Sequence, residues 1–188
     1  MKISETYEQA WGDWHWEVPE LFNMGVSICD AQDAKATALI VPQPNGGRRD
    51  YTFGDLKALS SRLSNLFVAH GLQRGDRVAV LLPQRPETLV AHIAGYRAGL
   101  IVMPLAQLFG PDALEYRLSD SGARAIVTDS VSCEKLTQIR DSLPDLQLVL
   151  SVDGPADDGA GGALDFHAEL ERAKDSFAPV DTANGDPA

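Results

Sequence analysis

Short runs of aliphatic and β-branched residues alternate through the middle of the chain with segments whose apolar residues recur at helical spacing. The continuously apolar runs cover residues 77–82, 100–104, 124–128 and 146–152. Runs of this length predict strands buried on both faces. The intervening segments predict helices over residues 86–98, 111–120 and 131–142. This β-α-β-α-β-α-β order with short connections predicts an α/β fold, part of a doubly wound, mostly parallel sheet with helices on both faces.

Two further elements precede this layer. Extended segments over residues 36–42 and 49–53 flank Asn45-Gly46-Gly47, and Asn-Gly between extended segments is typical of a β-hairpin. Thr52 stands three residues before Asp55, as in a capping box. Leucines at helical spacing follow until Gly71, so we expect an amphipathic helix of four or five turns after the hairpin.

The leading segment is rich in aromatic residues. All three tryptophans, Trp11, Trp14 and Trp16, lie within the first 20 residues. Such side chains usually dock a leading segment onto a larger body, and we expect them to do so here. Pro19 is placed to open a helix that runs to about Cys29.

Acidic residues are concentrated at the C-terminal end of the chain. The 188 residues carry 16 basic and 27 acidic side chains, a formal net charge of −11, which argues against nucleic acid or an anionic membrane as a partner. Residues 153–188 alone hold nine acids and two bases. We interpret them as an acidic loop, a short helix over 163–175 and an extended tail. The chain thus divides into a leading segment (1–35), an α/β core (36–152) and an acidic end (153–188).

Familiar chemical motifs are missing from the sequence. Cys29 and Cys133 have no CxxC spacing and the four histidines do not pair at i, i+3 or i, i+4, so no disulfide framework or zinc site is predicted. His92 could act as a general base, but a half-buried helix histidine is the favoured interpretation. The glycines at 159, 161 and 162 follow a strand, yet neighbouring acids would repel a phosphate.

The sequence has no apolar stretch approaching the roughly 20 residues that span a bilayer, and its first ten residues contain no signal-like apolar region. No transmembrane segment is therefore expected. The simplest expected location is the cytoplasm.

Four blocks of the sequence, in order, resemble the AMP-forming acyl-CoA synthetases of the adenylate-forming superfamily. The blocks are YTFGDL (51–56), GLQRGDRVAVLLPQRPE (71–87), YRAGLIVMPL (96–105) and LFGPDALEYRLSDSGARAIVTD (108–129). The last block is similar to the form found in medium-chain fatty acyl-CoA synthetases. The resemblance implies a ligase of fatty acid metabolism and an incomplete large N-terminal domain of such an enzyme.

In that family, ATP converts a carboxylate to an acyl-adenylate and pyrophosphate, and the acyl group then passes to coenzyme A, with Mg²⁺ assisting. The family's Ser/Thr/Gly-rich phosphate loop, its metal-ligating acid and its catalytic lysine have no counterpart in residues 1–188. Asp186-Pro187-Ala188 resembles the residues that stand shortly before that loop. The resemblance therefore predicts no catalytic, cofactor-binding or metal-binding residue here, and no tight binding of ATP, Mg²⁺ or coenzyme A by this chain alone.

Two hypotheses follow, one for a piece of an enzyme and one for a binding module. The chain is a piece of a ligase that is inactive by itself and has the remainder of the parent enzyme as its partner, or it is a free-standing, non-catalytic α/β module that binds a partner protein or an acyl ligand. An exposed sheet edge could also support self-association. Residues near the substrate or coenzyme A side would be Leu105, Gln107 and Phe109, after the strand that ends at Pro104. Alternatively, Leu105 and Phe109 close the core.

Overall fold

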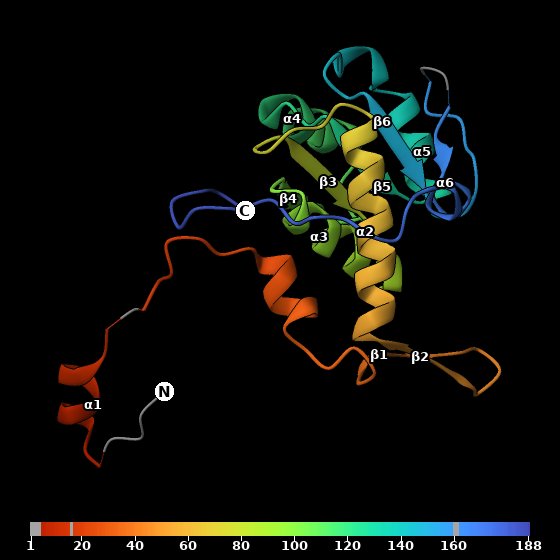
Figure 1. Cartoon of the computed structure of the whole chain (residues 1–188). Coiled ribbons are helices and arrows are strands. Elements are labelled where there is room, and N and C mark those ends of the chain that lie inside the picture. The colour runs from red at the N-terminus through yellow and green to blue at the C-terminus, as the bar shows by residue number, and fades with distance from the viewer. Residues whose placement is uncertain (1–4, 16, 160–161) are drawn as a thin grey trace.

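A five-stranded parallel sheet forms the centre of the protein, shown as a computed structural model in Figure 1. The structure describes residues 5–15, 17–159 and 162–188. The strand order is β4-β3-β5-β6-β7, and every neighbouring pair is parallel. The strands are β3 (Arg77–Leu81), β4 (Ile101–Pro104), β5 (Ala125–Thr128), β6 (Leu148–Ser151) and β7 (Leu164–Asp165).

Helices cover both faces of this sheet. On one face lie α2 (Phe53–Ala69), α3 (Pro86–Arg97) and α6 (Phe166–Arg172), and on the other α4 (Pro111–Ser121) and α5 (Ser130–Thr137). Because successive strand residues point to opposite faces, Val78 and Val80 join the first apolar cluster while Ala79 and Leu81 join the second. The predicted doubly wound α/β layer is confirmed.

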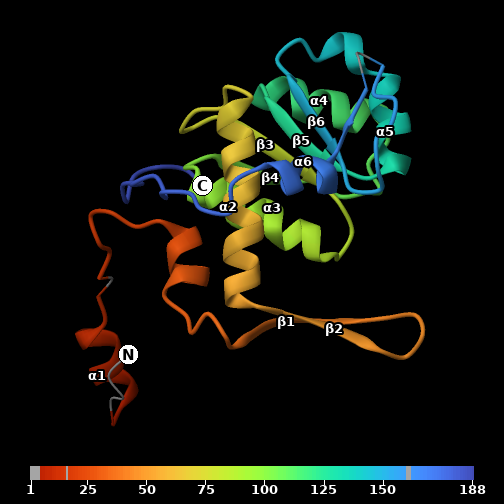
Figure 2. The ribbon, with the colours of Figure 1, turned by 45° about the vertical axis from the view of Figure 1, so that its right-hand side comes forward.

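The hairpin and its helix are also confirmed. Strands β1 (Thr37–Pro42) and β2 (Arg48–Thr52) pair antiparallel and project from the N-terminal end of α2 (Figure 2). The Thr52 hydroxyl accepts a hydrogen bond from Asp55 N, and the Asp55 carboxylate accepts one from Thr52 N at 2.8 Å. This capping box satisfies backbone donors that the first helical turn leaves open, and fixes the start of the 17-residue helix.

The helix predicted from Pro19 to Cys29 is wrong over its first part. Residues 19–23 are not helical, and the helical segment covers residues 24–30, of which Val26–Asp30 forms a π-helix. The residues before it run beside the tail of the chain: Phe22 N donates to Thr182 O at 2.8 Å and Asn184 N donates to Glu20 O at 3.1 Å. Backbone groups that pair with the tail cannot form helical hydrogen bonds, so long-range pairing decides the local conformation here.

Trp11 and Trp14 do not dock the leading segment onto the sheet. Trp11 lies on a helix that the sequence pattern did not predict, α1 (Tyr7–Asp13), and is 75% exposed; Trp14 is 52% exposed. Figure 1 shows α1 standing away from the sheet. The expected docking is therefore not found, and Trp16 lies outside the described residues.

Two details of the second half differ from expectation. The helix predicted over residues 131–142 ends at Thr137 and resumes only as a 3-10 turn at Arg140–Ser142. The two-residue strand β7 pairs with β6 at the edge of the sheet. It was not predicted, because its sequence contains no continuous apolar run. The short helix expected over 163–175 is present as α6.

Candidate functional site

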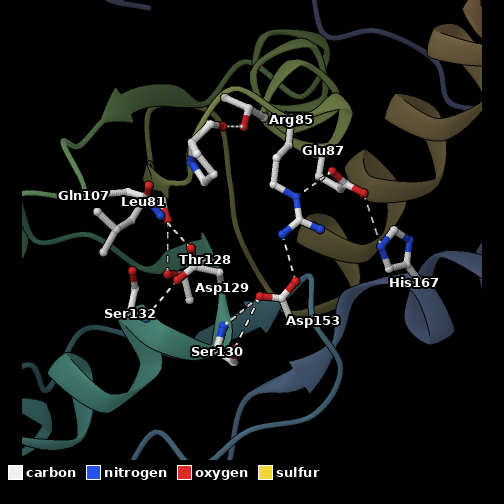
Figure 3. Close-up of polar contacts among 12 residues, drawn as sticks. Leu81, Arg85, Glu87, Gln107, Thr128, Asp129, Ser130, Ser132, Asp153 and His167 are labelled. Carbon is white, nitrogen blue, oxygen red and sulfur yellow. Dashed lines mark hydrogen bonds and ion pairs between the residues drawn. The ribbon is translucent and has the colours of Figure 1, made fainter. Parts of the chain in front are cut away.

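The candidate site lies at the carboxyl ends of the parallel strands. Strand β4 lies on one side of β3 and the next strand, β5, lies on the other, so the chain reverses its direction of travel across the sheet beside β3. Ligands of open α/β sheets bind outside the carboxyl ends of strands at such a reversal. Polar side chains from the loops after β3, β5 and β6 gather there (Figure 3).

Asp129 is the central acceptor of this edge. It follows β5, is 7% exposed, and accepts a hydrogen bond from Ser132 N at 2.8 Å as the N-cap of α5. Its second oxygen accepts one from Gln107 Nε2 at 2.6 Å. Lys135 Nζ donates to the backbone oxygens of Gln107, at 2.7 Å, and Phe109, at 3.2 Å. Side chains of the β5–α5 region thus fix the loop after β4 in one conformation.

The three residues singled out from the sequence have different environments. Gln107 belongs to the polar edge through Asp129. Leu105 is 7% exposed and lies in the core cluster under α4, and Phe109 packs against that cluster beneath the Arg117 guanidinium, 4.1 Å from the ring centroid. Between them, Leu108 is 97% exposed. The loop is therefore braced on both sides of one fully exposed leucine.

A chain of charged groups extends the edge toward α6. Arg85 Nη1 lies 2.8 Å from Asp153 Oδ1, Arg85 Nε lies 3.3 Å from Glu87, and Glu87 lies 3.4 Å from His167 Nε2. The hydrogen bond from Arg85, aided by Ser130, holds the pKa of Asp153 below its usual range. Sequence reasoning assigned Asp153 to a flexible loop, although its place directly after a buried strand was a signal for this edge.

Neither His92 nor Cys133 has the surroundings of a catalytic group. His92 Nδ1 lies 2.8 Å from Thr88 O, one turn back on the same helix, which is a structural contact. Cys133 is 1% exposed, and burial, with the charges of Asp158 and Asp129, raises the pKa of its thiol to about 11. A thiol of this pKa stays protonated and is a poor nucleophile at neutral pH.

The glycine-rich turn is likewise closed to phosphate. The Asp158 carboxylate accepts a hydrogen bond from Gly162 N at 2.8 Å and lies 3.3 Å from Arg140 Nε. An acid already occupies the backbone donor that a phosphate would need. Gly161 lies outside the described residues. Within the described ranges no three His, Cys, Asp or Glu side chains are placed together to hold a metal ion.

Comparisons with known proteins point to one enzyme family. The family profile described as AMP-binding enzyme matches residues 29–188. Human mitochondrial acyl-coenzyme A synthetase ACSM2B is 34% identical over 184 residues, which cover 93% of this chain and 31% of the relative. The mitochondrial ACSM3 synthetase of Rattus norvegicus is 30% identical over 190 residues, covering 96% of this chain and 32% of the relative. The chain thus spans about a third of the length of these curated relatives.

Solved structures of CoA ligases have the same fold as this chain. The acyl-CoA synthetase of Brucella canis superposes with a TM-score of 0.83 at 27% identity, over 96% of this chain and 34% of that one. An anthranilate CoA ligase in complex with anthranoyl-AMP superposes with a TM-score of 0.78 at 22% identity, over 90% of this chain and 31% of that one, which supports the fold.

The comparisons correct one expectation from the sequence. The cytoplasmic location is wrong by this evidence, because the curated relatives are mitochondrial by name. None of the helices in the described part of the chain is long and apolar enough to cross a membrane.

Proposed function

The chain belongs to the family of AMP-binding enzymes, and from this membership we propose that it forms the N-terminal part of a ligase that joins a carboxylic acid to coenzyme A with consumption of ATP. The observation that carries the proposal is the family match over residues 29–188. The 30–34% identity to acyl-coenzyme A synthetases over nearly the whole chain supports the same activity class. A medium-chain fatty acid is the proposed substrate.

In the proposed reaction the acid attacks ATP to give an acyl-adenylate and pyrophosphate, and the thiol of coenzyme A then displaces AMP. Developing charge on the leaving pyrophosphate calls for a metal ion and a phosphate-binding loop. No segment of residues 1–188 combines Ser, Thr and Gly with a lysine in such a loop. We therefore propose that residues 1–188 do not form the adenylate by themselves and that their contribution is structural support for a site completed elsewhere in the enzyme.

Within this chain, we assign the loop after β4 to the substrate or coenzyme A side of that site. Support comes from its place at the carboxyl edge beside the strand-order reversal. Gln107 supplies a polar group there, held by Asp129, while Leu105 and Phe109 anchor the loop in the core. Leu108, which is 97% exposed between these two anchors, is the apolar side chain that this loop would present to an acyl chain or a neighbouring apolar surface.

One experiment separates this proposal from a free-standing binding module. The DNA downstream of codon 188 is sequenced and translated in the three forward frames. A Ser/Thr/Gly-rich loop with a lysine within a few tens of codons is the expected result. An in-frame stop followed by unrelated sequence would overturn the ligase proposal and favour the module.

An exchange assay tests the inactivity of the isolated chain. Purified residues 1–188 are incubated with ATP, Mg²⁺, labelled pyrophosphate and octanoate. We expect no octanoate-dependent incorporation of label into ATP above the no-enzyme control. Incorporation that depends on octanoate would show that the isolated chain adenylates and would contradict this part of the proposal.

A further inference from the structure

Elements from three separate parts of the sequence, the consecutive β2 and α2, then α3 and α6, line a cavity of about 370 Å³ on the α2–α3 face of the sheet. Its floor is apolar and is made by Tyr51 of β2, Leu59 of α2, Val90 of α3, and Phe166 and Leu170 of α6. Small-molecule pockets typically measure roughly 300–1,000 Å³, with apolar walls and a few placed polar groups. The volume of this cavity fits a molecule of one or two rings, and its lining joins an apolar floor to several charged side chains.

Arg49 supplies a positive charge at the rim. Along a strand, residues two apart share a face, and the Arg49 guanidinium lies over the Tyr51 ring at 4.7 Å from its centroid. Among the described residues no carboxylate forms an ion pair with Arg49. Its neighbour Arg48 points to the opposite face of the hairpin, where it lies 3.1 Å from Asp50. The cavity therefore has a cation that is positioned by an aromatic ring and forms no ion pair among the described residues, although its charge also acts on the Asp55 carboxylate.

Two acidic side chains, Glu87 and Glu171, also line the cavity, and neither forms an ion pair with Arg49. Glu87 already lies 3.3 Å from Arg85 Nε and 3.4 Å from His167 Nε2. Glu171 is exposed at the end of α6, and Arg62, whose guanidinium also lines the cavity, donates to Leu170 O and lies 3.8 Å from Asp175. An anionic group on a ligand would therefore find its best partner at Arg49.

We propose that this cavity binds a flat apolar molecule that carries one anionic group, a carboxylate or sulfonate, with its rings over Tyr51 and Phe166 and its anion against Arg49. The cavity is separate from the loop after β4, and its occupancy does not require adenylation. Failure of the acyl-CoA ligase proposal would therefore leave this inference standing, and the reverse also holds.

The test uses 8-anilinonaphthalene-1-sulfonate, which combines an aromatic body with a sulfonate. The intact 188-residue chain is titrated by fluorescence beside two variants, Arg49→Gln and its matched control Arg48→Gln. Loss of one charge-assisted hydrogen bond is expected to weaken binding about five- to tenfold in Arg49→Gln, whereas Arg48→Gln should stay within about twofold of the wild type. Equal affinity in all three proteins, or equal weakening in both variants, would overturn the proposal.

Two further measurements locate the probe. Amide shifts in nitrogen-15 spectra should move at Tyr51, Phe166 and His167, and a change centred instead on α1 would assign binding to the exposed aromatic residues there and contradict the proposal. Leu59→Trp should fill the cavity and reduce affinity at least tenfold while the protein keeps its wild-type circular dichroism spectrum. A folded Leu59→Trp protein that binds the probe as tightly as the wild type would rule the cavity out.

Discussion

The parallel sheet and the leading segment are built on opposite principles. In β5 and β6 every residue is buried, and each strand contributes side chains to apolar clusters on both faces. In α1 no residue is buried. The segment between α1 and the hairpin places Cys29 in the core cluster and is also attached by polar contacts, such as the Asn23 amide that donates to Tyr96 O and Val180 O, both at 2.9 Å. The sheet is therefore stabilised by apolar burial throughout, whereas the leading segment is held by one buried side chain and individual polar tethers.

The largest test of this contrast removes apolar volume from each region. Ile126 in the central strand β5 has no exposed surface, so Ile126→Ala should lower the free energy of unfolding by about 2–5 kcal/mol through lost burial and a residual cavity. Trp11→Ala removes a larger side chain that is 75% exposed and should change it by less than about 0.5 kcal/mol. Urea unfolding followed by circular dichroism measures both. A Trp11→Ala loss as large as that of Ile126→Ala would mean that α1 docks in solution.

The same contrast explains how much of the fold could be predicted from the sequence. Buried parallel strands need continuous apolar runs, and helices that cover them need apolar residues on one face, so both leave a local signature. The Asn45-Gly46 turn and the Thr52–Asp55 capping box are local as well. These elements were predicted with their order, and the fold class followed from the order.

Contacts between distant residues left no such signature. Glu20 and Phe22 pair with the tail more than 150 residues away, and this pairing replaces the first part of the helix expected from Pro19. The hydrogen bond between Gln107 and Asp129 joins the ends of two strands, so it depends on the strand order β4-β3-β5 and not on either local sequence. Candidate residues could be placed at the carboxyl edge from the sequence, but their partners could not.

Two threonine N-caps give a smaller, closely matched test. Thr52 caps α2, which packs on the core, and Thr6 caps α1 in the same way by accepting a hydrogen bond from Gln9 N at 3.2 Å. Thr52→Ala should lower the free energy of unfolding by about 1 kcal/mol, because a helix donor loses its partner in an element that unfolds with the core. Thr6→Ala should leave the global transition unchanged and reduce only local helicity. Equal shifts of the urea midpoint in the two variants would show that α1 unfolds together with the sheet.

The smallest expected effect is the pH dependence of one tether. Asp30 ends the π-helix, and its carboxylate lies 2.6 Å from Nη1 of the buried Arg97 and 3.2 Å from Lys57 Nζ. Burial alone would raise the pKa of Asp30, but hydrogen bonds and charges from Arg97 and Lys57 outweigh it and hold the pKa below its usual range. A carboxyl group with a depressed folded-state pKa adds stability that is complete above its unfolded pKa of about 3.9 and is lost as the pH falls through the folded value.

Asp30→Asn should therefore reduce stability at pH 7 and flatten the decline of the urea midpoint between pH 5 and about pH 3. Asp33→Asn is the control, because Asp33 is exposed in the turn that follows and has neither Arg97 nor Lys57 as an ion-pair partner among the described residues. Its pH profile should follow that of the wild type. If Asp30→Asn kept the wild-type decline as well, the tether would contribute nothing to acid stability, and attachment of the leading segment would rest on its uncharged contacts, such as those of Asn23 and Cys29.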